Sequence, residues 1–246
     1  KWAQLGAFYP FMRNHNANNT NPQEFYQFDE EYQKGMKESL KQRYSLLRYY
    51  YTWLYKSHKY GDPTVRHPMY DEPEDDEMVK IEDAYMIGDA LRVSMHFEEN
   101  TDRKEFEIAF PKGKWIEYYS YNVTDIPYDT GVVMLETGTA WTHLHIKQGS
   151  ILPIQDVSDV TKTYDLLHKQ MRLLVVPNHE GYAKGSIFIA EGEKTDEDTQ
   201  YFSINHSSER VIRFDLIEGE PTDRGTHLNE VLEEIHIVGD KEALKA

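Results

Sequence analysis

The feature of this sequence that most constrains its fold is a change of hydrophobic period near Gly88. After Gly88, apolar and polar side chains alternate in short runs bounded by Gly, Pro, Asn and Asp, as in half-buried strands. Nine such runs follow one another, from LRVSMHF at residue 91 to EEIHIVG at residue 233, and no helical pattern separates them. This part of the chain is therefore predicted to form antiparallel β-sandwich structure.

The part before Gly88 has the period of a helix. Apolar side chains spaced by three and four residues form one stripe: Met36, Leu40, Tyr44, Leu47, Tyr51 and Leu54. Asp29 is a plausible N-cap, and Gly61 and Pro63 supply a stop. The stripe predicts one long helix at about 30–59 that packs against a sheet. A short strand near 64–70 and a weak helix near 79–88 are expected to follow.

The run Leu5–Met12 is almost entirely apolar and ends in Arg13, Asn14, His15 and Asn16. A continuous apolar run is typical of a strand that is buried on both faces. α/β barrels place their active sites at the C-terminal ends of such strands. The pattern therefore predicts a barrel strand whose polar tip faces a site, and an α/β part that precedes the all-β part.

The composition excludes several classes of function. The net charge of −16 and the pI near 5.1 argue against a nucleic-acid partner, which would require a basic face. No apolar run approaches the roughly 20 residues of a membrane-spanning helix. With no cysteine, the chain has no disulfide framework and no thiol chemistry.

No metal or cofactor site is predicted. His143 and His145 are two residues apart on one predicted strand, a spacing that allows chelation, but no third ligand is in register. We therefore expect an exposed histidine ladder. The acidic runs at 71–77 and 191–199 lack the spaced Asp and Gly of a calcium loop, so we expect solvated loops. Three Asn-x-Ser/Thr patterns, at Asn18, Asn122 and Asn205, are candidate glycosylation sites.

Trp2, Gln4–Phe11 and Arg13–Asn16 resemble the late-barrel segment of glycoside hydrolase family 31, in its α-glucosidase or maltase-like branch. Further segments resemble motifs of the same family in the same order along the chain. These segments are RYSLLRYYYTWLY, TVRHPMYDEP, MIGDALRVS, FPKGKWIEYYS, IKQGSILPIQD and KGSIFIAEGEKTD.

The resemblance implies the end of a (β/α)8 catalytic barrel followed by proximal and distal β-sandwiches. We expect these parts at residues 1–88, 89–155 and 156–246. It further implies a retaining, exo-acting hydrolase of terminal α-linked glucose, which needs two carboxyl groups at the scissile bond. In the family both are Asp residues upstream of this segment, and no Asp of this chain matches them. The implied partners are therefore the upstream part of the same enzyme and an α-glucoside oligosaccharide.

The resemblance also assigns roles to residues of the polar tip. His15 is expected to hydrogen-bond the glucose ring, and Arg13 either contacts the sugar or braces the tip together with Asn14. Phe11 and Tyr9 either shape the pocket wall or belong to the core, and we expect the core. Arg66 is a candidate partner for an acidic group of the barrel.

Three departures from the family pattern leave a second hypothesis open. Arg48 replaces a usual Pro, His67 interrupts an Arg-Pro pair, and Gln148 replaces a Gly. A catalytically inactive relative, acting as a structural or carbohydrate-binding subunit, would also fit this pattern. The match at Gln4–Asn16 favours lysosomal-type and maltase-like enzymes, so a lysosomal or secreted location is expected rather than the endoplasmic reticulum.

Overall fold

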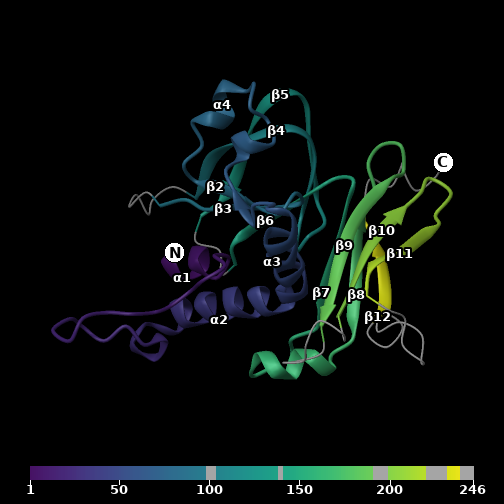
Figure 1. Cartoon of the computed structure of the whole chain (residues 1–246). Helices are drawn as coiled ribbons and strands as arrows, with labels where there is room; N and C mark the ends of the chain where they lie inside the picture. The colour runs from purple at the N-terminus through teal and green to yellow at the C-terminus, as the bar shows by residue number, and fades with distance from the viewer. Residues whose placement is uncertain (98–103, 138–140, 191–198, 220–231, 239–246) are drawn as a thin grey trace.

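The computed structural model describes residues 1–97, 104–137, 141–190, 199–219 and 232–238 (Figure 1). A helical N-terminal part precedes two β-sheets. The helices are α1 (Trp2–Gly6), α2 (Glu30–Ser45), α3 (Leu47–Tyr60) and α4 (Asp76–Val79), with 3-10 turns at Phe25–Gln27, Pro68–Tyr70 and Thr163–His168. The first six strands are β1 (Val65–Arg66), β2 (Ala84–Ile87), β3 (Leu91–Ser94), β4 (Glu105–Glu117), β5 (Val123–Glu136) and β6 (His143–Lys147). The other six are β7 (Ser150–Gln155), β8 (Met171–Val176), β9 (Ala183–Ala190), β10 (Thr199–His206), β11 (Ile212–Glu218) and β12 (Leu232–Ile237).

The strand predicted for Leu5–Met12 is wrong. The chain forms the short helix α1 and then a series of turns that ends near residue 11. Leu5, Ala7 and Phe8 are buried, which accounts for the apolar run. A short apolar run is compatible with a buried helix as well as with a buried strand, and the period does not distinguish them.

The helix predicted for 30–59 is two helices that meet at Leu46 and run in different directions (Figure 1). The amide of Leu46 is shared between the carbonyls of Gln42 and Arg43, as is common where a helix ends. Asp29 does precede the first helix, and Gly61 ends the second in the left-handed conformation (φ 80°).

The break moves the buried face away from the predicted stripe. Tyr51 and Leu54 are exposed, whereas Leu46, Tyr49 and Trp53 are buried in the main core. The weak helix predicted near 79–88 is also wrong, because α4 ends at Val79 and the segment then contains strand β2.

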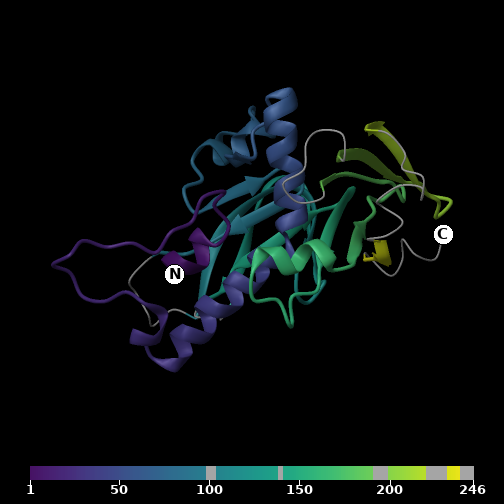
Figure 2. The same cartoon turned by 60° about the horizontal axis from the view of Figure 1, so that its bottom comes forward.

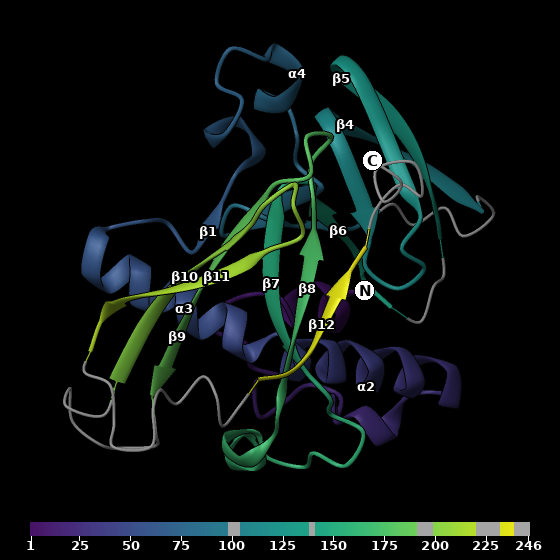
Figure 3. The same cartoon turned by 90° about the vertical axis from the view of Figure 1, so that its right-hand side faces the viewer.

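The first sheet has the strand order β1-β2-β3-β6-β4-β5, with every pairing antiparallel. The second sheet has the order β11-β10-β9-β7-β8-β12 and is mixed, since β7 pairs with β9 and β12 with β8 in parallel. Figures 1 and 3 show α3 lying against β9 of this second sheet. All nine runs of period two contain strand, and the run at 142–153 holds two.

The predicted divisions of the chain do not coincide with the sheets. Strands β1 and β2 precede residue 88 but belong to the first sheet, and β7 lies within residues 89–155 but belongs to the second. The chain passes between the sheets at Gln148–Gly149, where Gly149 adopts a positive φ of 82°. A two-residue connection of this kind leaves no polar linker that a composition-based boundary would detect.

The helical part and the first sheet are joined by close packing around Trp53. Gly88 has a positive φ of 58°, and a Cβ at this position would lie 2.0 Å from the Trp53 ring. Trp53 and Ile87 belong to the same buried cluster as Leu91 and Leu174, so this core reaches both sheets. No helix in the described residues is long and apolar enough to span a membrane.

Candidate functional site

The predicted polar tip lies on a long loop between α1 and α2 (Figures 1 and 2). Arg13, Asn14 and His15 are all exposed in this chain, and so is every residue from Arg13 to Glu24. In both views the loop extends away from the helices and sheets. The loop thus presents the predicted substrate-binding residues on a surface that is open to solvent or to another part of the protein.

Short-range hydrogen bonds hold the loop in shape. The Asn14 side chain donates to the carbonyl of Gln23 (2.6 Å), and the Asn16 side chain donates to the carbonyl of Asn21 (2.9 Å). These bonds cross between the outgoing and returning arms of the loop. His15 lies between the two asparagines, so its backbone position is set from both sides.

The segment that leads into the loop is held by one side chain of α2. The Arg43 guanidinium donates to three backbone carbonyls, those of Ala7 (2.7 Å), Tyr9 (2.6 Å) and Pro10 (3.0 Å). A planar guanidinium carries five donors in a fixed fork, which suits this contact with successive carbonyls. Arg43 opens the RYSLLRYY motif, and the sequence analysis assigned it no role.

Other side chains bond three more carbonyls of this segment. Tyr50 donates to Phe8 (2.6 Å), Tyr85 donates to Leu5 (3.2 Å), and Thr142 donates to Gln4 (2.9 Å). These donors come from α3, β2 and the segment before β6. The approach to the loop is thus fixed to both the helical part and the first sheet without any strand pairing.

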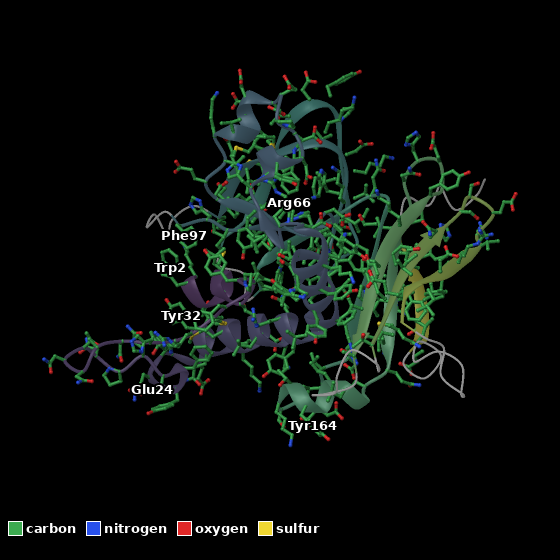
Figure 4. All side chains as sticks on the ribbon, viewed as in Figure 1. Trp2, Glu24, Tyr32, Arg66, Phe97 and Tyr164 are labelled. Carbon is green, nitrogen blue, oxygen red and sulfur yellow. The ribbon has the colours of Figure 1, made fainter. Side chains whose placement is uncertain are left out.

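Tyr9 and Phe11 are not core residues in this chain, which corrects the expectation. Their exposed fractions are 37% and 75%, and Tyr9 packs beside Tyr85 with ring centroids 5.6 Å apart. Trp2 is likewise 73% exposed, and the centroids of its ring and of the Phe97 ring are 4.8 Å apart. Figure 4 shows these two side chains beside each other. Exposed aromatic side chains therefore lie around α1 and the start of the loop.

Arg66 finds its acidic partner within this chain. Its guanidinium lies 2.8 Å from a carboxylate oxygen of Asp71 and stacks near the rings of Trp53 and Tyr70. Figure 4 places Arg66 within the body of the molecule, above α3. This partly buried pair joins the strand β1 to the 3-10 turn that follows it.

The three departures from the family pattern lie in different local environments. His67 caps the 3-10 turn by accepting from the Met69 amide, and its other nitrogen contacts the Ile81 carbonyl at 2.6 Å. Arg48 is buried in the first turn of α3, and burial lowers its pKa. The backbone amide of Gln148 donates to the Lys114 carbonyl beside the connection between the sheets, a bond that does not depend on the Gln side chain.

His143 and His145 are buried, so the expected exposed ladder is wrong. His145 of β6 lies opposite Arg92 of β3, which is also fully buried. Both side chains contact the ring of Phe110. Burial, together with the charge of nearby Arg92, lowers the pKa of His145 to about 3. A neutral histidine beside a buried arginine belongs to the core of the first sheet.

The described residues contain no group of three or more His, Cys, Asp or Glu side chains placed to hold a metal ion. The acidic run at 71–77 includes the first turns of α4, where Asp75 caps the helix with its side chain. Most of the run at 191–199 lies outside the described residues. The three glycosylation candidates, Asn18, Asn122 and Asn205, are exposed.

A cluster where α3 meets the second sheet was not predicted from the sequence, because its residues are far apart along the chain. The Glu218 carboxylate accepts hydrogen bonds from the hydroxyls of Tyr55 (2.7 Å) and Tyr60, and Lys59 lies 2.9 Å away. These donors lower the pKa of Glu218 to about 2. The Tyr55 ring stacks on Phe188 of β9, with centroids 3.9 Å apart. This cluster fastens α3 to β9 and β11.

Comparison with known families agrees with this arrangement. Residues 1–53 match the glycosyl hydrolase family 31 TIM-barrel domain, and residues 61–152 match the C-terminal domain of the same family. The chain belongs to glycosyl hydrolase family 31. Its helical part is the end of the barrel domain, and its two sheets follow as the C-terminal β structure of this family.

Curated relatives include the lysosomal alpha-glucosidase of Bos taurus, 33% identical over 207 residues. That match covers 78% of this chain and 22% of the relative. "Probable alpha/beta-glucosidase agdC" of Aspergillus clavatus is 33% identical over 196 residues, covering 78% and 21%. This family 31 chain therefore spans about a fifth of the length of these relatives.

Solved structures share the fold along the whole chain. A crystal structure of the glucosidase II alpha subunit superposes with a TM-score of 0.87 at 23% identity. The match covers 100% of this chain and 27% of that one. At this identity the likeness concerns the fold alone.

Proposed function

We propose that this chain is the C-terminal portion of a retaining, exo-acting α-glucosidase that releases terminal α-linked glucose from oligosaccharides. In this proposal the nucleophile and the acid/base, both Asp, lie upstream and flank the scissile bond. The loop that carries Arg13 and His15 supplies part of the glucose-binding wall. The chain contributes substrate contacts and no catalytic carboxylate.

The observation that carries the proposal is the braced, exposed loop. Hydrogen bonds of Asn14 and Asn16 hold the backbone around His15, and Arg43 fixes the segment that precedes it. Binding residues commonly lie on loops fixed by a rigid scaffold. Because Tyr9 and Phe11 are exposed beside it, they are available to line the same wall.

The alternative of an inactive structural or carbohydrate-binding relative loses the support of one departure, because His67 has a local structural role as the cap of a 3-10 turn. For the location, we propose the lysosome or the exterior of the cell. The relative from Bos taurus is named a lysosomal enzyme, and all three glycosylation candidates are accessible. At least one of Asn18, Asn122 and Asn205 should then carry a glycan, which the mass of native tryptic peptides would show.

The main experiment replaces His15 in the full-length enzyme. His15→Ala should reduce kcat/KM for maltose roughly 100-fold, equivalent to about 3 kcal/mol of lost transition-state stabilisation. The control is His58→Ala, which removes an exposed histidine at the end of α3 and should leave kcat/KM unchanged. Activity of the His15 variant within twofold of the parent would remove this residue from the site.

A second experiment expresses residues 1–246 alone and assays a chromogenic α-glucoside. We expect no turnover, since both catalytic carboxylates would be missing. Hydrolysis at the rate of the intact enzyme would show that this chain itself holds the catalytic pair, which contradicts the proposal.

A further inference from the structure

A cleft with a volume of about 920 Å³ lies between the two sheets, away from the loop of His15. Its floor is the end of the second sheet, where β9, β10 and β11 lie side by side (Figures 1 and 3). Its opposite wall comes from β4 and the end of β6, and its rim includes the turn between β8 and β9. The proposed α-glucosidase activity does not involve this cleft.

The floor of the cleft carries a row of polar side chains across three strands. Asn205 of β10 is paired with Lys184 of β9 on one side and with Arg213 of β11 on the other. Paired residues of neighbouring strands point to the same face of a sheet, and strands lie about 4.8 Å apart. The two cations are therefore rooted about 10 Å apart, with an amide between them.

The charge of the cleft is opposite to that of the chain. The lining contains four Lys or Arg side chains but only two carboxylates, in a chain with 27 basic and 43 acidic residues. Lys147 lies 3.8 Å from Glu72, which is one of those carboxylates. Within the described residues, no carboxylate lies within 4 Å of the charged groups of Lys112, Lys184 or Arg213.

These unneutralised cations face one another across the cleft, with Lys112 on the first sheet and Lys184 and Arg213 on the second. At physiological salt the Debye length is about 8 Å, so the distant acidic surface is largely screened. An anion in the cleft would interact mainly with the cations around it. Phosphate and sulfate groups match guanidinium and ammonium donors in both charge and geometry.

The rim adds groups that suit a sugar. Tyr182 is 49% exposed and presents an apolar ring face, on which the C–H face of a pyranose can pack. Asn178 accepts the amides of Glu180 and Tyr182 through its side-chain oxygen, so its own amide group is left for a ligand hydroxyl. The Asn205 amide in the floor can donate and accept in the same way.

We propose that this cleft binds a saccharide that carries phosphate or sulfate groups. The charged groups of the ligand lie over Lys184 and Arg213 and reach Lys112, and a sugar ring packs on Tyr182. A glycan attached to Asn205 would fill the same space, so the proposal requires that Asn205 is unmodified and that any glycan is on Asn18 or Asn122.

The test uses the full-length protein and isothermal titration calorimetry with sucrose octasulfate and inositol hexakisphosphate, which distinguish sulfate from phosphate. We expect at least one probe to bind in 20 mM salt, and its affinity should fall at least tenfold in 500 mM salt. Maltose should not bind to this site. The double variant Lys184→Gln/Arg213→Gln should bind the probe with an affinity at least tenfold lower than that of the parent. The control, Lys34→Gln/Lys37→Gln, makes the same charge change at two exposed lysines of α2. Its affinity for the probe should stay within twofold of that of the parent.

A second variant tests the sugar contact. Tyr182→Ala should weaken sucrose octasulfate about fivefold or more, while the affinity for pyrophosphate, which has no ring, should not change. If the two double variants lowered the affinity for the probe equally, the assignment of the binding site to the cleft would be overturned. Failure of both charged probes to bind would also overturn it. Pyrophosphate binding as tight as that of the saccharide would overturn the assignment to a sugar. A glycan mass on the native Asn205 peptide would overturn the proposal as a whole.

Discussion

Arg43 is predicted to be the residue that holds the approach to the His15 loop. Arg43→Met retains most of the aliphatic stem but removes all three hydrogen bonds to the carbonyls of Ala7, Tyr9 and Pro10. The Ala7 carbonyl is partly buried, whereas the bonds to Tyr9 and Pro10 are exposed. Water can replace a donor at an exposed carbonyl, so the three bonds do not contribute equally.

The expected magnitude follows from this difference. One charged hydrogen bond to a buried carbonyl contributes about 1.5–3 kcal/mol. The two exposed bonds and the contact of Arg43 with the Tyr50 ring, 5.6 Å away, add about 1 kcal/mol together. We therefore expect Arg43→Met to destabilise the segment by about 2.5–4 kcal/mol, with little effect on the second sheet.

Hydrogen–deuterium exchange of the full-length protein measures this local effect. Since each 1.4 kcal/mol is a factor of ten, amides at residues 8–16 that exchange by local opening should do so about 60-fold faster or more. The control Lys41→Met removes a half-exposed ion pair with Glu38 on the same helix, worth about 0.2–1 kcal/mol at most. Unchanged exchange in the Arg43 variant, or equal acceleration in both variants, would refute the bracing role.

Three further predictions concern the packing of the helices. Leu46→Ala should lower the free energy of unfolding by about 2–5 kcal/mol and Leu47→Ala by clearly less, because only Leu46 is fully buried. Equal shifts in melting temperature for the two variants would contradict the break between α2 and α3. Gly88→Ala should lower the melting temperature by several degrees through strain at its positive φ and the clash with Trp53, and an unchanged melt would contradict that packing. The lowered pKa of Glu218 stabilises the fold above about pH 4.5, and this contribution is lost as the pH falls toward 2. Glu218→Gln should therefore lower the melting temperature at pH 6 more than at pH 2.5, and a pH-independent difference would argue against the cluster.

After Gly88, the local pattern of the sequence determined which segments form strands. A period of two depends only on neighbouring residues, and each predicted run after Gly88 contains strand in the structure. The end of α3 at Gly61 was also encoded locally, since glycine adopts the left-handed conformation without steric cost. The similarity of Gln4–Asn16 to family 31 identified the family through side chains alone, without any knowledge of the backbone around them.

The tertiary structure decided what those local patterns left open. An apolar run is compatible with a helix or a strand, so only its packing and the carbonyl bonds of Arg43 and Tyr50 fixed α1 and the turns after it. The buried face of α2 and α3 depended on the break at Leu46, which shifts the phase of the stripe. Likewise His145 is buried because β6 pairs with β3 inside the first sheet, and no local pattern specifies that pairing.

The two proposed sites differ in the same way, since the sequence could predict one of them and only the tertiary structure shows the other. The residues of the His15 loop are contiguous, so the sequence could present them together. The cleft cations Lys112, Lys184 and Arg213 come from three strands, and they face one space only because the chain changes sheets at Gln148–Gly149 and brings β4 opposite β9 and β11. Hydrophobic period is set by neighbours along the chain, whereas convergence of distant charges is set by strand order, which only the folded structure contains.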